Sequence, residues 1–233
     1  MKIRLKYFFL LTTLFVLAAC SASDFIELVV RQKITATDGA GLDMFGCSVS
    51  LSANGQIALI GAPGNDNNGT NSGAAYVFTH SDSTWTQETK LTPAASTADK
   101  AFGCSVSLSV DGSTALIGDC YDDDGGKKAG SAYIFTRSNS TWTQEAKLTA
   151  ADSTANAEFG KSVSISADGS TALIGAISSN DNITDFGSAY VFVNSDSTWT
   201  QQAKLTASDG TVGNKFGFSL SLSADGDTAL IGA

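Results

Sequence analysis

One unit recurs along the chain every 57 residues, and this regularity limits the possible folds more than any other feature. Tryptophan returns with that spacing at Trp85, Trp142 and Trp199. Ala-Leu-Ile-Gly and Gly-x-Ala-Tyr motifs keep the same spacing, without insertion or deletion. Phe-Gly pairs mark the repeat units near residues 45, 102, 159 and 216: Phe45, Gly46, Phe102, Gly103, Phe159, Gly160, Phe216 and Gly217. A fixed period of this length is typical of propellers, solenoids and other arrays of one supersecondary unit.

Within one unit, four short segments alternate polar and apolar residues, as half-buried strands do. In the second unit these segments span 104–109, 114–118, 131–136 and 142–149. Asp111-Gly112 separates the first two segments, and every other unit has Asn-Gly or Asp-Gly there. This dipeptide predicts a two-residue hairpin with a type I′ turn. The pattern as a whole predicts an all-β chain, a β-propeller built from four-stranded antiparallel blades.

Serine-rich strand faces indicate how neighbouring blades pack. In the predicted hairpin register, Ser107 of one strand lies opposite Leu116 of the next. Small residues facing large ones across adjacent sheets allow both faces to be buried. Residues 28–35 align with the fourth strand of a unit, and the last unit is incomplete. We therefore expect about 3.5 blades of 57 residues, a fragment of a larger ring. An open arc, or a ring closed by several chains, is the alternative.

Composition narrows the classes of function. The 233 residues include 14 Lys and Arg against 23 Asp and Glu, a net charge of −9. Nucleic-acid binding needs an excess of cations, so we expect no nucleic-acid partner. The single histidine, His80, lies at an exposed strand end in this reading and leaves little room for a catalytic triad or a His-based metal site. No nucleophile elbow or phosphate loop occurs, so we expect no enzyme activity.

Residues 1–19 have the features of a signal peptide, with cations at positions 2, 4 and 6 followed by an apolar run over 7–19. The run is shorter than the roughly 20 residues that a membrane-spanning helix needs. Removal of residues 1–19, which hold three cations and no acidic residue, changes the net charge from −9 to −12. An acidic body of this kind would not be held to an anionic membrane by a basic patch.

Leu-Ala-Ala-Cys over 17–20 resembles the bacterial lipobox. The resemblance implies cleavage before Cys20, lipid on that cysteine and, because Ser21 follows, sorting to the outer membrane. Residues 20–27 would be a short linker. We therefore expect an exported lipoprotein of the bacterial envelope that touches the membrane only through its lipid. The alternative is a secreted protein with an ordinary signal peptide.

The Phe-Gly pair, followed later in the first unit by Gly-Ala-Pro at 61–63, resembles the FG-GAP repeat of integrin α propellers. Gly-x-Ala-Tyr-Val-Phe and Trp-Thr-Gln-x-x-Lys-Leu-Thr are closer to the bacterial FG-GAP subtype. The resemblance covers residues 28–233. It implies a propeller, commonly of seven blades in integrins, that serves extracellular binding. Integrin repeats often hold calcium before Gly-Ala-Pro, but here a tight Asp-Gly hairpin supplies too few oxygens for the usual 6–8 ligands.

Alternating strand directions bring the loops after each second strand and each fourth strand to one face. Loops on a rigid scaffold are where function concentrates, so we expect a protein or glycan ligand to bind there. The Asp122-Asp123-Asp124-Gly125 stretch is the best candidate for a cation such as Ca²⁺, although it lacks a complete EF-hand pattern. A solvated acidic loop is the alternative. The candidate cation or ligand residues are Asp66, Asn68, Asp119, Asp122, Asp123, Asp124, Asp181 and Asp185.

Cys47, Cys104 and Cys120 would remain after lipidation of Cys20. The hairpin register places Cys104 opposite Asp119, which turns Cys120 to the other face and argues against a disulfide within that blade. We expect all three thiols to be free. The tryptophans have the size to stack on sugars, but their recurrence at a strand start in every unit favours packing.

Three functions follow from these observations. The first is a non-enzymatic, lipid-anchored binding or adhesion module. The second is a propeller enzyme, a hydrolase or lyase, with catalytic residues in blades that the sequence does not include. The third is a structural spacer of the cell envelope.

Overall fold

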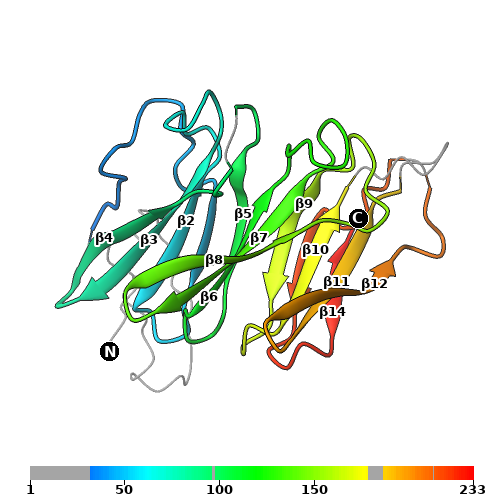
Figure 1. Ribbon diagram of the computed structural model, residues 1–233. Helices are drawn as coiled ribbons and strands as arrows, with labels where there is room; N and C mark the ends of the chain where they lie inside the picture. The colour runs from blue at the N-terminus through cyan, green and yellow to red at the C-terminus, as the bar shows by residue number, and fades with distance from the viewer. Residues whose placement is uncertain (1–31, 96–97, 178–185, 212) are drawn as a thin grey trace, which may run out of the picture. The chain divides into compact units, whose positions relative to one another are not determined.

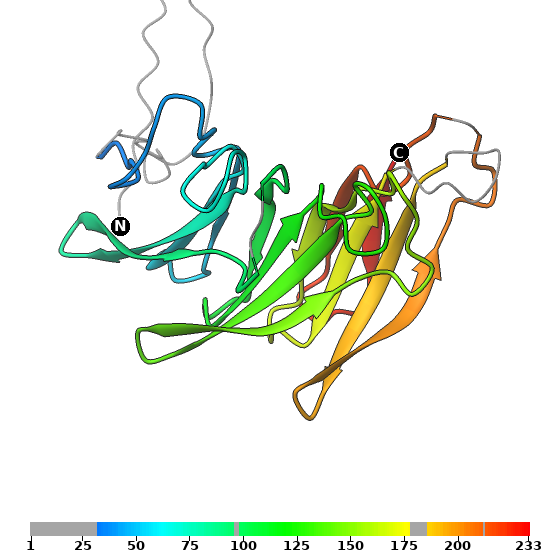
Figure 2. The same ribbon diagram turned by 45° about the horizontal axis from the view of Figure 1, so that its top comes forward.

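Figures 1 and 2 show a computed structural model of the protein, which describes residues 32–95, 98–177, 186–211 and 213–233. One compact unit comprises Thr35–Ala233, and the second unit holds the residues up to Ile34. The predicted signal peptide, Cys20 and the linker lie outside the described residues. No helix in the described ranges is long and apolar enough to cross a membrane.

Four antiparallel sheets follow one another along the chain (Figure 1), each with its strands in chain order. The first blade holds β1 (Ser48–Leu51), β2 (Ile57–Ala62), β3 (Ala74–Ser81) and β4 (Thr84–Leu91). The second holds β5 (Phe102–Leu108), β6 (Thr114–Asp119), β7 (Ser131–Ser138) and β8 (Thr141–Leu148). The third holds β9 (Phe159–Ile165), β10 (Thr171–Ala176), β11 (Ser188–Ser195) and β12 (Thr198–Leu205), and the last sheet pairs β13 (Ser219–Leu222) with β14 (Ala229–Gly232). These sheets confirm the all-β, propeller-type fold with four-stranded antiparallel blades.

The hairpin that joins the first two strands of each blade differs from its prediction. Ser107 pairs with Leu116 as expected, so the register is confirmed. In the turn, the Gly112 N–H donates to Ser109 O and φ is positive at Gly112, at 72°, but not at Asp111. A type I′ turn needs positive φ at both central residues, so that prediction is wrong. Asp111 Oδ1 instead accepts hydrogen bonds from Ser109 Oγ and Ser113 N, which hold it in the ordinary backbone region.

The strand expected over 28–35 is not formed in its described part, because residues 32–35 belong to no β-ladder. A fourth strand pairs with the third strand of its blade. The described third strands, β3, β7 and β11, already pair with β4, β8 and β12. Residues 32–35 therefore have no third strand among them to join.

A buried cluster lies at each of the first two junctions between blades. The ring of Phe102 is fully buried and meets Tyr133 and Phe135 edge-on, with ring centroids 5.5 and 6.1 Å apart. Leu59 of the first blade belongs to the same cluster. At the next junction Leu116 packs in the cluster around Phe159, and Ser107 Oγ accepts a hydrogen bond from the Ile165 N–H at 3.2 Å. Ser107 and Leu116 thus both take part in the junction with the third blade.

The glycine of Ala-Leu-Ile-Gly lies where two blades come closest. A Cβ atom on Gly118 would lie only 2.0 Å from the carbonyl oxygen of Gly160 in the third blade. Ser105 Oγ donates to that same oxygen at 2.7 Å, which fixes its position. Gly61 and Gly175 face the carbonyl oxygens of the following blades in the same way, at 2.0 and 2.1 Å. Contact between blades, rather than a turn, therefore requires glycine here.

Replacing Gly118 with alanine should lower the free energy of unfolding by about 3 kcal/mol, because a backbone oxygen occupies the space that the methyl group needs. Gly232→Ala is the matched control. Gly232 occupies the same repeat position in β14, and a Cβ there would approach only atoms of Ser219 within its own blade. Urea unfolding of both variants measures the difference. Equal losses of stability would show that the contact between blades is not what selects glycine.

Candidate functional site

The loops after β2, β4, β6, β8, β10 and β12 share one side of the blades, and we call this side the long-loop face. Backbone hydrogen bonds join its loops: Asp99 N–H donates to Thr70 O at 2.7 Å, and Tyr121 N–H donates to Lys100 O at 2.9 Å. The hairpins that join β3 to β4, β7 to β8 and β11 to β12 project at the opposite ends of the strands (Figure 2). As far as it is described, the long-loop face comprises residues 63–73, 92–95, 98–101, 120–130, 149–158, 177, 186–187, 206–211 and 213–215.

A cavity of about 600 Å³ lies on this face. Its wall brings together the first blade, the second blade and the start of β9 in the third. The volume is within the range of small-molecule sites. Polar and ionisable lining residues include Asn71, Asp99, Tyr121, Lys127, Lys128 and Lys161, and all three cysteines of the described residues line it as well.

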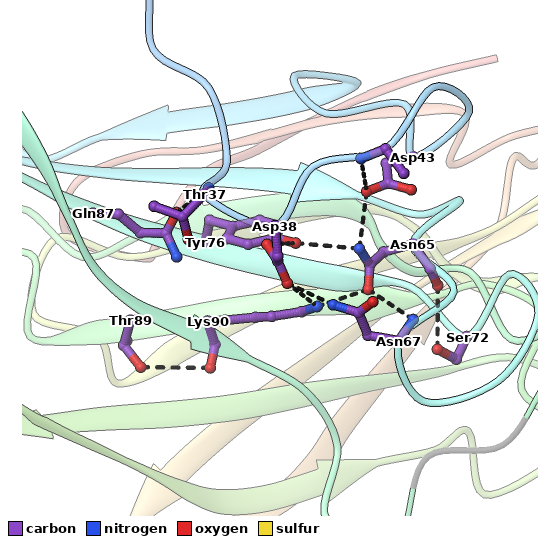
Figure 3. Close-up of polar contacts among 11 residues, drawn as sticks. Thr37, Asp38, Asp43, Asn65, Asn67, Ser72, Tyr76, Gln87, Thr89 and Lys90 are labelled. Carbon is purple, nitrogen blue, oxygen red and sulfur yellow. Dashed lines mark hydrogen bonds and ion pairs between the residues drawn. The ribbon is translucent and has the colours of Figure 1, made fainter.

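A tyrosine, a lysine and an acidic residue form the same polar cluster in each full blade. In the first blade (Figure 3), Tyr76 Oη donates to Asp38 Oδ1 at 2.9 Å, and Lys90 Nζ lies 2.8 Å from Asp38 Oδ2. The same ammonium group lies 5.4 Å from the centroid of the Tyr76 ring and donates to Asn65 Oδ1 at 2.8 Å. Asn65 Nδ2 in turn donates to Asp43 Oδ2 at 3.0 Å. Burial and the hydrogen bond to Asp38 raise the pKa of Tyr76.

In the second blade, Asp122 replaces Asn65 and supplies the acidic group itself. Its Oδ2 accepts hydrogen bonds from Ser131 Oγ at 2.6 Å and Tyr133 Oη at 3.2 Å. Lys147 Nζ lies 2.6 Å from the same oxygen. Burial alone would raise the pKa of Asp122, but the hydrogen bonds from Lys147 and Ser131 lower it. This carboxylate is therefore already occupied by groups of its own blade.

The other two carboxylates of the predicted cation loop, those of Asp123 and Asp124, also form ion pairs with lysines. Lys100 Nζ lies 2.9 Å from Asp123 Oδ2, and Lys147 pairs with Asp124 as well as with Asp122. Within the described ranges, no group of three or more His, Cys, Asp or Glu side chains is arranged to hold a metal ion. The loop is therefore organised by ammonium groups, and its geometry gives no support for calcium.

The remaining candidate residues do not gather into one site. Asp66 is exposed and its Oδ1 accepts a hydrogen bond from the Asn71 N–H at 2.7 Å, while Asn68 is exposed on the same loop. Asp181 and Asp185 lie outside the described residues. Asp119, predicted as a loop residue, is instead the last residue of β6.

Asp119 is the one described carboxylate that is buried with an unpartnered oxygen. Its side chain is 2% exposed, and Oδ1 has no hydrogen-bond partner among the described residues. Burial, and then the negative charge of Asp122, raise the pKa of Asp119 to about 9. The equivalent residues, Ala62 and Ala176, are buried without any such cost. Asp119 therefore holds its proton at neutral pH.

Trp142 and Trp199 connect neighbouring blades. Trp142 Nε1 donates to Glu88 Oε1 of the first blade at 3.2 Å, and Arg137 Nη2 lies 2.7 Å from Glu88 Oε2. Trp199 Nε1 donates to Glu145 Oε1 of the second blade at 3.1 Å. Each glutamate occupies a β-bulge of its strand, where an extra residue is re-aimed towards the neighbouring blade. The alternation of polar and apolar residues gives no signal for these bulges. The contacts of the two glutamates with the neighbouring blade could therefore not be predicted from the sequence.

At the far end of the strands, His80 pairs with Trp85, and their rings lie 4.9 Å apart. Both residues flank the hairpin between β3 and β4, at the opposite end of those strands from the long-loop face.

The profile of the FG-GAP repeat family matches residues 29–78, 85–135, 142–192 and 199–233. The chain belongs to the FG-GAP repeat family. The matched segments follow the 57-residue period of the tryptophans. No curated protein matches the chain.

Solved structures resemble this FG-GAP chain at low sequence identity. Hydrazine synthase of Kuenenia stuttgartiensis is 13% identical, with a TM-score of 0.51, over 86% of this chain and 45% of that one. Sqt1 of Saccharomyces cerevisiae is 11% identical, with a TM-score of 0.45, over 72% of this chain and 37% of that one. The chain thus spans less than half the length of either structure. At this identity the likeness to the first concerns its propeller-type fold alone.

The cysteines depart from their predicted placement. β5 pairs Phe102 with Asp119 and then Ser105 with Gly118, so a bulge contains Cys104. Cys104 therefore does not lie opposite Asp119, so that prediction is wrong. The predicted hairpin register holds only from Ser105 to Leu108. The bulge brings the Cys104 side chain near Cys120, and the two thiols influence each other's pKa. All three cysteines of the described residues are free thiols.

Replacing Asp119 with alanine should stabilise the FG-GAP chain at neutral pH, by an amount that grows with pH. The folded protein keeps the proton of Asp119 up to a pKa of about 9, whereas the unfolded chain loses it near the ordinary value of 3.8. The stability of the natural protein is therefore greatest below the lower value and falls as pH rises towards the higher one, by at most about 1.4 kcal/mol per pH unit from this group.

Urea unfolding of the natural protein and Asp119→Ala between pH 4 and pH 8 tests this. Asp119→Asn, which keeps a polar side chain but cannot titrate, should show the same widening difference from the natural protein. A difference in stability that does not change with pH would contradict the assignment of a protonated Asp119.

Proposed function

We propose that this FG-GAP chain is a non-enzymatic binding or adhesion module that takes a protein or glycan ligand in the cavity of the long-loop face. The cavity is the observation that carries the proposal. It gathers loops from successive blades, and those loops differ in sequence from unit to unit while the strands repeat. A rigid scaffold with variable loops around a concave site is the usual arrangement for recognition.

The lining favours a ligand that carries a carboxylate. Lys127 and Lys128 are exposed, and neither pairs with an acidic group of the described residues. Lys128 Nζ and Lys161 Nζ lie 4.6 and 5.6 Å from the centroid of the Tyr121 ring. Among the described residues, Asp99 is the only acidic one in the lining. Ammonium groups beside an aromatic ring suit an acidic protein side chain or the uronic acid of a glycan.

The non-enzymatic part of the proposal concerns hydrolysis of the ligand and rests on the position of the histidine, outside the lining as the structure describes it. The single histidine of the chain, His80, lies at the β3–β4 hairpin, at the other end of the strands from the cavity. Hydrolysis of any member of a glycan panel by the purified protein would overturn this part.

Export and lipid anchoring complete the proposal and rest on sequence. Residues 1–19 carry the signal-peptide pattern, and Cys20 closes the segment that resembles a lipobox. Lipid on that cysteine would present the acidic propeller at the bacterial outer membrane without direct contact between the protein surface and the bilayer.

Reversing the two exposed charges of the cavity should weaken binding about tenfold, because two favourable contacts with a carboxylate become repulsive. The change is Lys127→Glu with Lys128→Glu. The measurement is binding to an array of acidic peptides and of oligosaccharides with and without uronic acids. Lys215→Glu is the matched control, an exposed lysine of the long-loop face that does not line the cavity. The site is wrong if the double variant binds as the natural protein does, or if the control weakens binding equally.

Cys20→Ser should abolish lipid attachment when the full gene product is made in a bacterial host. Labelled palmitate should enter the natural protein and not the variant, since the thiol is the acceptor. Mass spectrometry of the variant should find residues 1–19 still present. Equal labelling of the two proteins, or cleavage of the natural protein at another bond without lipid, would support ordinary secretion instead.

A further inference from the structure

The second blade carries a pair of cysteines that the repeat does not require. The position of Cys120 is held by Pro63 in the first blade and Ile177 in the third. The position of Cys104 is held by Cys47 and Lys161. Because the same blade forms with proline or isoleucine at the first position and lysine at the second, packing alone does not explain two thiols here.

The bulge in β5 places these two thiols together. Gly103 and Cys104 are the extra residues between the pairs Phe102–Asp119 and Ser105–Gly118. Cys104 Sγ donates to the Gly160 carbonyl oxygen at 3.5 Å, and its thiol also interacts with that of Cys120. Both thiols line the cavity, although Cys120 is only 2% exposed. A reactant that reaches Cys120 must therefore be small.

The surroundings favour a thiolate on Cys120. Interaction with the Cys104 thiol and then the positive charge of Lys161 lower the pKa of Cys120, against the effect of burial. Burial and the neighbouring Cys120 raise the pKa of Cys104. Cys120 is therefore the thiol that ionises more easily, and Cys104 is the one that stays protonated. The thiolate is the form that reacts with oxidants.

We propose that Cys104 and Cys120 are a redox-active dithiol, which a small hydroperoxide entering the cavity oxidises to a disulfide within the second blade. The Cys120 thiolate attacks the peroxide O–O bond, takes one oxygen as sulfenic acid and releases the other as hydroxide or alkoxide, which is protonated. Cys104 then attacks the sulfenic sulfur, forms the S–S bond and releases water. Two thiols lose two electrons and two protons, and the peroxide is reduced to water and an alcohol, or to two waters. A dithiol reductant restores the pair.

Treatment of the full chain with hydrogen peroxide tests the proposal. The expected product has lost two hydrogen masses, and its peptide map contains a cross-link between Cys104 and Cys120, distinct from any product of Cys20. Cys104→Ser should give no cross-link and a sulfenic acid on Cys120 that dimedone traps. Cys120→Ser should give neither product. Cys120→Ile, which copies the third blade, provides a second variant should the serine protein fail to fold.

Cys47→Ser is the matched control, because Cys47 occupies the repeat position of Cys104 and lines the same cavity but faces a proline position rather than a second cysteine. It should retain the cross-link at an unchanged rate. Lys161→Met should slow oxidation of Cys120 several-fold at neutral pH, and this difference should shrink at a pH where the thiol ionises without help.

Three outcomes would overturn the proposal: a cross-link that uses Cys47, no cross-link under peroxide, or faster oxidation by glutathione disulfide than by peroxide. The last would show that exchange with a larger disulfide, rather than a hydroperoxide, is the reaction of this pair. None of these results depends on ligand binding, so the binding proposal stands or fails separately.

Discussion

The carbonyl oxygen of Gly160 leaves no room for a side chain on Gly118, and the stacking of the blades depends on this contact between two backbones. Because the backbones approach so closely, serine is long enough to bridge from one blade to the next. Ser50 Oγ accepts the Leu108 N–H at 3.0 Å, and Ser107 and Ser164 repeat the contact at the following junctions. Polar strand faces can then be buried with their hydrogen bonds satisfied, which is what a core rich in serine needs.

A junction that is the same in every blade makes departures from the repeat informative. The last position of the second strand is held by Ala62 in the first blade and Ala176 in the third, and both alanines are buried without burying a polar group. Asp119 at that position keeps a proton and an unpartnered oxygen, and Cys120 follows it immediately. A residue that breaks a local rule where the repeat offers a satisfactory alternative indicates a functional requirement rather than a packing one. Both departures lie in the blade that contributes most to the cavity wall.

The repeat and the alternation were sufficient to predict the strands of the repeat units and the pairing of Ser107 with Leu116, because these follow from a period of two and a period of 57. The family was predicted from the resemblance of its motifs. Apart from the strand expected over 28–35, the errors lie where the chain leaves the period. The bulges at Cys104, Glu88 and Glu145 insert residues that no alternation reveals, and they decide which side chains meet. The hairpin type was missed for a local reason, since the hydrogen bonds of Asp111 keep that residue out of the conformation that Asp-Gly commonly adopts. Ion pairs between residues distant in sequence, such as Lys100 with Asp123, could likewise not be predicted from the spacing of motifs.

The net charge of −9 is a poor guide to the long-loop face, because it does not show which acidic side chains are paired with lysines distant in sequence. Lys90, Lys147 and Lys204 recur with the tryptophans, and each lies near a tyrosine ring and pairs with an acid supplied by Asp38, Asp122 or Asp152. The repeat therefore neutralises many of its own loop carboxylates, which makes them a poor cation site. Among the described lining residues, the charges without an ion pair are those of Lys127, Lys128 and Asp99. Since salt screens charges beyond about 8 Å, these nearby groups, rather than the acidity of the whole chain, decide the charge that a ligand at the cavity meets.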